Sequence, residues 1–229
     1  RGGPPGRSAT PFTMQQRPWH AHYDDGVPSA IEFEDLTIPD FLDRTVQRFG
    51  DRPAVFFMNK TLTYADLREA VDRLATGLAG LGVKEGTRVA IQMPNIPQLV
   101  IAYYVTLRLG GVVVLTNPLY MGYEIEHQWN DAGCEVALVA DFIYDQKLQH
   151  MAGKTGIRHY VVAGIADYLG FQLNWIAPLK LKRADPPLAA KVHESATVHQ
   201  FKKLIERSAA DPPRVRRSFD DIAVLQYTG

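Results

Sequence analysis

Short apolar strands alternate with amphipathic helices along the middle of this chain, and the alternation limits the folds that it can adopt. The predicted strands are runs of valine, leucine, isoleucine and alanine at 88–92, 111–115, 136–140 and 160–163. Helical spacing of apolar residues predicts the intervening helices at 98–109, 123–132 and 142–152. Apolar strands separated by helices are typical of a parallel sheet that is covered on both faces. The predicted fold class is therefore α/β, with a mostly parallel sheet flanked by helices.

A helix, a hairpin and a second helix are predicted ahead of this alternating region. The first helix opens at Pro39 and ends at Gly50. Two short strands at 54–57 and 60–63 are predicted to pair across a turn, after which Thr63 caps the next helix.

Composition changes at both ends predict four segments. Residues 1–18, rich in Gly, Pro, Arg and Ser, are expected to form a disordered leader. Residues 19–163 form the α/β subdomain, and residues 164–211 are expected to leave the sheet. Residues 212–229 contain a returning strand, predicted at 220–226.

Charge and cysteine content exclude some classes of partner and of covalent structure. Lys+Arg and Asp+Glu are 25 each among 229 residues, so no general field attracts nucleic acid, and no nucleic-acid partner is expected. The single cysteine, Cys134, excludes an intrachain disulfide and is interpreted as a packed residue. No secretory signal is visible, so the expected location is the cytoplasm.

The residues show little complete chemistry. Neither a Gly-x-Gly-x-x-Gly nor a Gly-x-x-x-x-Gly-Lys-Ser/Thr motif is present, and no metal site or catalytic residue is predicted. The segment Thr116-Asn117-Pro118 follows a predicted strand, where open α/β sheets bind ligands, but Asn117 also suits a cap for the turn. Asp220-Asp221 is interpreted either as a ligand of a metal–nucleotide complex or as a cap in a turn. The pair His20 and His22 is interpreted as a surface feature, and the other histidines as structural.

Several motifs together resemble the adenylate-forming enzymes. They lie at 62–67 (LTYADL), 93–95 (MPN), 107–114 (LRLGGVVV) and 116–120 (TNPLY), followed by 124–133 (EIEHQWNDAG). The last two are similar to bacterial long-chain fatty acid–CoA ligases in particular. The resemblance covers roughly residues 19–229. One departure is Met121-Gly122-Tyr123, where the family usually has Thr-Pro-Arg.

The resemblance implies a truncated N-terminal subdomain of such an enzyme. It implies that residues 225–229 (LQYTG) begin a loop that wraps the phosphates of ATP, with Thr228 and Gly229 at its first edge. The remaining catalytic and Mg²⁺-binding residues are expected beyond residue 229, so the chain alone is predicted to be inactive. The implied substrates and cofactors of the whole enzyme are a fatty acid, ATP, Mg²⁺ and CoA, and the family also suggests a homodimer.

Two alternatives remain open. One is another adenylate-forming enzyme, such as an aryl-CoA ligase or a peptide-synthetase adenylation domain, in which the segment 164–211 is usually shorter. The other is a non-enzymatic α/β binding module.

An uncharged run at 168–179 precedes Lys180, Lys182 and Arg183. Its apolar residues recur at helical spacing from Ile165, and the run is too short to span a bilayer. One hypothesis is a helix in the membrane interface, with Phe171 and Trp175 facing the lipid at the inner membrane face. The alternative is a helix packed on the protein itself.

Overall fold

The computed structural model describes residues 17–169 and 181–227, and the chain divides into two units, residues 1–35 and 36–229. In the first unit, a short 3₁₀ helix, η1 (Pro18–His22), is followed by a turn in which the Val27 N–H donates to the Asp24 carbonyl over 3.1 Å.

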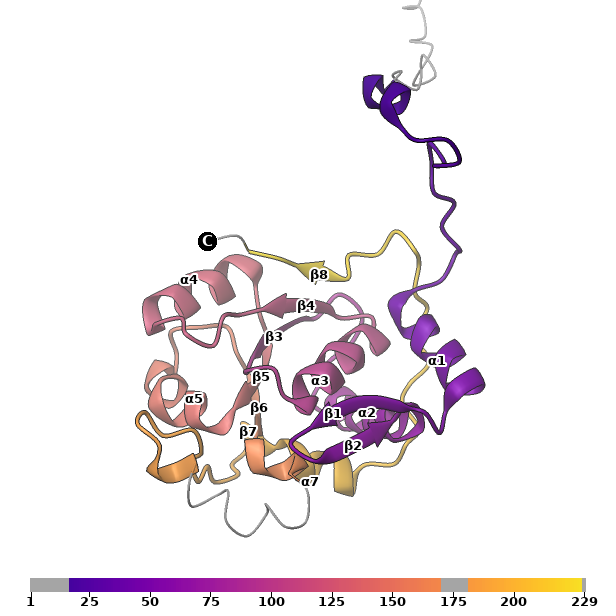
Figure 1. The fold of residues 1–229 in the computed structure, drawn as a ribbon. Helices are drawn as coiled ribbons and strands as arrows, with labels where there is room; N and C mark the ends of the chain where they lie inside the picture. Colours follow the sequence, from indigo (N-terminus) through magenta and orange to yellow (C-terminus); the bar gives the residue numbers. More distant parts are fainter. Residues whose placement is uncertain (1–16, 170–180, 228–229) are drawn as a thin grey trace, which may run out of the picture. The chain divides into compact units, whose positions relative to one another are not determined.

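A six-stranded parallel sheet forms the centre of the second unit (Figure 1). Its strand order is β7-β6-β5-β3-β4-β8, and every neighbouring pair is parallel. The strands are β3 (Arg88–Gln92), β4 (Val112–Leu115), β5 (Val136–Ala140), β6 (His159–Ala163), β7 (Val198–Gln200) and β8 (Val224–Leu225). The α/β class predicted from the sequence is confirmed.

Helices cover both faces of the sheet. Figure 1 shows α4 (Gly122–Ala132) and α5 (Asp141–Gln146) on one side, and α2 (Tyr64–Gly80) and α3 (Pro97–Arg108) on the other. Two more helices, α1 (Ile38–Phe49) and α7 (Phe201–Arg207), pack against α2. Arg108 fastens this layer through ion pairs of 2.9 Å with Asp43 on α1 and 2.7 Å with Asp72 on α2.

The predicted hairpin forms beside these helices. Strands β1 (Pro53–Phe57) and β2 (Lys60–Thr63) pair antiparallel, and Met58 and Asn59 at the turn have φ of 42° and 65°. The capping prediction for α2 is also confirmed, because the Thr63 hydroxyl accepts from the Asp66 N–H over 3.1 Å.

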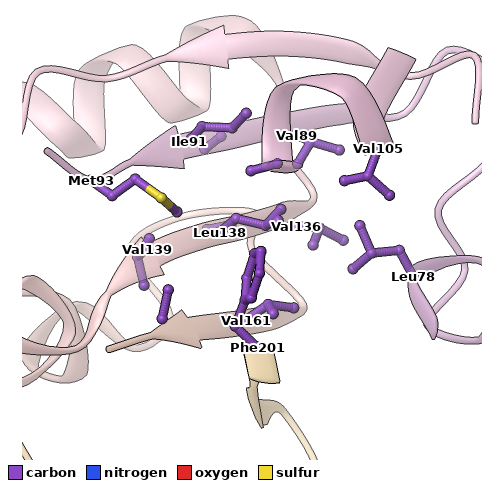
Figure 2. Packing of buried hydrophobic residues seen from close by; sticks show 14 of the residues in the cluster. Leu78, Val89, Ile91, Met93, Val105, Val136, Leu138, Val139, Val161 and Phe201 are labelled. Carbon is purple, nitrogen blue, oxygen red and sulfur yellow. The ribbon is translucent and has the colours of Figure 1, made fainter. Parts of the chain in front are cut away.

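Aliphatic residues of the central strands make the core. Figure 2 shows Val89, Leu138 and Val161 of three adjacent strands with the ring of Phe201 packed among them. Phe201 and Trp129 are the largest fully buried side chains in the described part of the chain. Burial on both faces explains why the strand sequences lack an alternating polar position.

Three elements differ from the prediction. The helix expected over 142–152 is broken at Lys147, with φ of -128°, into α5 and a 3₁₀ helix, η2 (Leu148–Met151), and the Lys147 side chain donates to two carbonyl groups of another loop. Residues 164–211 do not stay outside the sheet, since β7 lies within them. The returning strand is limited to Val224–Leu225.

The helix predicted from Ile165 onward does not form at its first residues. Only a 3₁₀ turn, η3 (Ile165–Tyr168), forms before Leu169 becomes extended, and Ile165 and Leu169 are both buried. Phe171 and Trp175, expected to face a membrane, lie outside the described residues. Within 17–169 and 181–227, no helix is long and apolar enough to cross a bilayer.

Candidate functional site

Open α/β sheets bind their ligands at the carboxyl ends of the strands, next to the point where the winding direction reverses. Helix α3 connects β3 to β4 on one face of the sheet, whereas α4 leaves β4 on the other face and leads to β5, on the far side of β3. This reversal of winding direction puts the topological switch point between β3 and β5. A cavity of about 470 Å³ lies next to it, at the carboxyl ends of β3 and β4. Its lining residues come from the ends of β3, β4 and β8 and from α3 and α4: Ile91, Met93, Asn95, Leu99, Leu115, Thr116, Asn117, Pro118, Tyr120, Gln128, Gln226 and Tyr227.

A smaller cavity of about 160 Å³ lies at the amino ends of β4 and β8. Its cation, Arg217, is occupied by Asp40 at 3.0 Å. The cavity at the carboxyl ends of β3 and β4 is the candidate site, because open α/β sheets bind their ligands at that edge.

The segment Thr116-Asn117-Pro118 lies at this cavity, as the sequence predicted, but its polar side chains serve the protein. The Thr116 hydroxyl accepts a 2.8 Å hydrogen bond from the indole N–H of the fully buried Trp129. The Asn117 side-chain oxygen accepts from the Leu119 N–H over 2.9 Å, which confirms the capping interpretation. These two residues shape the wall of the cavity.

Three buried glutamines at the same edge are the residues that sequence reasoning missed. Gln92, Gln98 and Gln128 each donate one amide hydrogen to a backbone carbonyl, over 3.0 Å, 2.7 Å and 3.0 Å respectively. The side-chain oxygen of each has no hydrogen-bond partner among the described residues. A buried acceptor without a partner costs free energy, so a water or a ligand donor at these positions is favoured. Gln128 lines the cavity itself.

Lys147 holds the β4–α4 loop that forms one rim of the cavity. Its ammonium donates to the Pro118 carbonyl over 3.1 Å and to the Tyr120 carbonyl over 2.7 Å. Burial lowers the pKa of Lys147, while the nearby Glu124 opposes that shift. The cation thus positions the backbone of the loop, in which Leu119 and Met121 are exposed.

Tyr227 brings the end of the chain to the cavity. Its hydroxyl donates to the Asp131 carboxylate over 2.5 Å, and this bond, with burial, raises the pKa of Tyr227 to about 12. Thr228 and Gly229, predicted to begin the phosphate loop, lie outside the described residues. They follow directly a residue that lines the cavity.

Two carboxylates lie beside Gly164, whose carbonyl accepts from Gln98. Asp141, directly after β5, accepts from the Phe142 and Ala190 N–H groups over 2.7 Å and 3.1 Å, and Asp167 accepts from the Gly164 N–H over 3.1 Å. Burial is the main cause that raises the pKa of Asp141 to about 6, and burial also raises that of Asp167. Among the described residues no cluster of three or more His, Cys, Asp or Glu side chains suits a metal ion.

Other sequence candidates prove structural. The Asp221 carboxylate accepts from the Ser218 N–H over 2.7 Å, which confirms its role in a turn. Cys134 is buried, and burial raises the pKa of its thiol to about 12, so it is a packed residue.

Comparison with known proteins decides the family. The family described as "AMP-binding enzyme" matches residues 42–229. This chain belongs to the AMP-binding enzyme family. The long-chain-fatty-acid–CoA ligase of Bacillus subtilis (strain 168) is 34% identical over 223 residues, which cover 94% of this chain and 38% of that relative.

Solved structures of AMP-binding enzymes share the fold. A long-chain-fatty-acid–CoA ligase from Archaeoglobus fulgidus matches with a TM-score of 0.67 at 21% identity, over 90% of this chain and 37% of its own. An anthranilate CoA ligase in complex with anthranoyl-AMP also has a TM-score of 0.67, at 17% identity, over 85% of this chain and 32% of its own. The chain thus spans about 38% of the length of the Bacillus relative and corresponds to an N-terminal part of such enzymes.

Proposed function

We propose that this chain forms the N-terminal part of an ATP-dependent fatty acid–CoA ligase. The observation that carries the proposal is the 34% identity with the Bacillus subtilis long-chain-fatty-acid–CoA ligase over 94% of the chain. The cavity at the carboxyl ends of β3 and β4 supports it, because a site at that edge is what a ligand of this fold requires.

The proposed reaction has two steps. The carboxylate of a fatty acid attacks the α-phosphate of ATP, which forms acyl-AMP and releases pyrophosphate. The thiol of CoA then attacks the acyl carbonyl and displaces AMP, which gives the thioester.

In this reaction the described residues shape a binding wall. Gln128 offers an unpartnered acceptor, and Lys147 holds the adjoining loop. Thr228 and Gly229 are proposed to meet the phosphates with a hydroxyl and a backbone N–H. Since the described residues contain no suitable cluster of ligands, the Mg²⁺ ligands are expected in the remainder of the enzyme.

The test compares two proteins, this chain and the longer polypeptide that continues through Gly229. Each is assayed for palmitate-dependent release of pyrophosphate from ATP, with anthranilate as the competing substrate. We expect release by the longer protein with palmitate and none by the chain alone. Acyl-AMP formation by the 229-residue chain would overturn the prediction of inactivity, and preference for anthranilate would favour the aryl-CoA ligase alternative.

Thr228→Ala tests the proposed phosphate contact in the longer protein. One hydrogen bond to a charged group is worth roughly 1.5–3 kcal/mol, so acyl-AMP formation should slow about tenfold or more. Thr61→Ala, at an exposed position in strand β2, is the matched control. An unchanged rate in Thr228→Ala would remove this hydroxyl from the site.

The membrane contact and the homodimer stay proposals. Phe171→Glu with Trp175→Glu should abolish binding of the longer protein to anionic liposomes while circular dichroism stays unchanged. Sedimentation of the longer protein tests the dimer.

A further inference from the structure

Two histidines meet on the outer part of the sheet, on strands that the candidate site does not use. His159 begins β6 and His199 is the central residue of β7. The Nδ1 atom of His159 lies 3.2 Å from the Nε2 atom of His199. Their separation of 40 residues in the sequence hides this pair from any search for closely spaced ligands.

The register of the sheet produces the pair. Side chains alternate along a strand, so His159 and Val161 of β6 point to the same face. Val161 is the cross-strand partner of His199, which puts both imidazoles on one face. The two ring centroids are 5.3 Å apart, with 40° between the ring planes. A hydrogen-bonded sheet, rather than a loop, therefore sets the separation of the two nitrogens.

A separation of 3.2 Å suits a shared cation. Zinc–nitrogen bonds of about 2.0–2.1 Å at a tetrahedral angle place two ligand nitrogens roughly 3.3 Å apart. The two facing nitrogens have no room for a proton each, so one must present a lone pair. His199 is 9% exposed. A metal ion binds the neutral form of an imidazole.

We propose that His159 and His199 form a two-nitrogen binding site for a divalent transition-metal ion such as zinc. No third protein ligand joins them among the described residues, so water completes the coordination. This proposal is independent of the proposed ligase function.

The surrounding charges act in opposite directions on such an ion. The Glu194 carboxylate, before β7, favours a positive charge at His199, and Arg207 at the end of α7 disfavours one. Glu194 is itself paired with Lys203 at 3.1 Å and with Arg207 at 3.6 Å. With two nitrogens and balanced neighbours, we expect affinity in the micromolar range rather than the tighter binding of a site with four protein ligands.

The 229-residue chain is titrated with zinc chloride, and isothermal titration calorimetry at about pH 7.5 measures the binding. All proteins carry His20→Gln and His22→Gln, which remove a histidine pair that is closely spaced in the sequence. We expect one zinc ion per chain, and at least tenfold weaker binding in His159→Gln and in His199→Gln. His127→Gln, on the exposed face of α4, is the control and should bind as the background does.

A second measurement separates ligation from a structural role. Zinc should shift the imidazole NMR resonances of His159 and His199 and leave those of His127 and His150 in place. Undiminished affinity in either glutamine variant, or no binding at about 1 mM zinc, overturns the proposal. Because His159 is only partly buried, His159→Gln decides the question should His199→Gln fail to fold.

Discussion

Asp141 shows at the scale of one residue how the carboxyl edge of the sheet alters acid–base behaviour. Its side chain is 8% exposed, and burial raises its pKa from 3.8 to about 6. Hydrogen bonds from two backbone N–H groups act in the opposite direction but do not cancel this shift. An ionised Asp141 is therefore less favourable in the folded chain than in the unfolded one. Its stabilising contribution is complete below the unfolded pKa of 3.8 and is lost as the pH rises through about 6.

Asp141→Asn should remove this pH dependence. A shift of about 2 pH units corresponds to roughly 3 kcal/mol, so the free energy of unfolding of the wild type relative to the variant should fall by about 2–3 kcal/mol between pH 4 and pH 7. Urea unfolding of both proteins at the two pH values measures it. Asp211→Asn, at an exposed position, serves as the control. A difference that does not change with pH would contradict the assignment.

Lys147→Met should loosen the rim of the candidate site. Methionine keeps the apolar stem but cannot donate to the carbonyls of Pro118 and Tyr120. Loss of these charge-assisted bonds should speed hydrogen exchange of the amides at 119–121 about tenfold or more. Lys154→Met, at an exposed position, is the control. Equal exchange in both variants would show that the ammonium does not hold the loop.

The candidate site was only partly predictable at this scale. Thr116 and Asn117 could be located because they follow a recognisable strand. Gln92, Gln98 and Gln128 could not, because a lone amide in an apolar run has no spacing signal and its partners come from other elements. His159 and His199 were interpreted as scattered for the same reason.

At the scale of elements, the contact between α2 and α7 depends on a glycine, Gly77, at the point where the two helices meet. A Cβ atom on Gly77 would lie 2.7 Å from Cγ of Leu204, 2.8 Å from its Cδ1 and 2.9 Å from Oγ of Ser208. Gly80, one turn further along α2, has no atom within 4 Å of the same position. The two glycines form a matched pair in one helix.

Gly77→Ala should lower the free energy of unfolding by about 1–3 kcal/mol, because overpacking forces α7 away from α2. Gly80→Ala should be neutral or stabilising by up to about 1 kcal/mol, since alanine has the better helix propensity. Urea denaturation of the two variants gives the comparison. Equal effects at both positions would mean that α7 does not pack closely at Gly77.

Elements with a repeating pattern were predicted well, and short ones were not. The strands at 88–92 and 136–140 have the predicted bounds. The three residues of β7 are too few to show periodicity, and a histidine and a glutamine among them hide the strand. The break at Lys147 coincides with side-chain contacts to carbonyls almost thirty residues away in sequence, which no local pattern could show.

For the whole second unit, one segment has to carry the chain from β7, at one edge of the sheet, to β8 at the other (Figure 1). Arg217 anchors that segment by donating to Asp40 over 3.0 Å and to the Arg108 carbonyl over 3.2 Å. Burial opposes ionisation of Asp40, but the bonds from Thr37 and Arg217 outweigh it and lower the pKa of that carboxyl. The order of strands was not predictable, because apolar parallel strands carry no mark of their neighbours.

Arg217→Met should release β8 without unfolding the centre of the sheet. Hydrogen exchange of the Val224 and Leu225 amides should become about tenfold faster or more, while amides of β3 and β5 keep their protection. Arg216→Met, at the exposed neighbouring position, is the control. Equal acceleration in every strand would indicate a general loss of stability instead of a lost anchor.

The strand order also has a consequence for synthesis on the ribosome. β4 pairs with β3, β5 takes the other side of β3, and β6 and β7 each extend the same edge in turn. β8 then joins the free side of β4. From β4 onward, each strand pairs with a strand that has been synthesised before it, and no strand has to be inserted between two others. The nascent sheet can grow outward from its centre, which limits how long a bare central edge is open to wrong pairing.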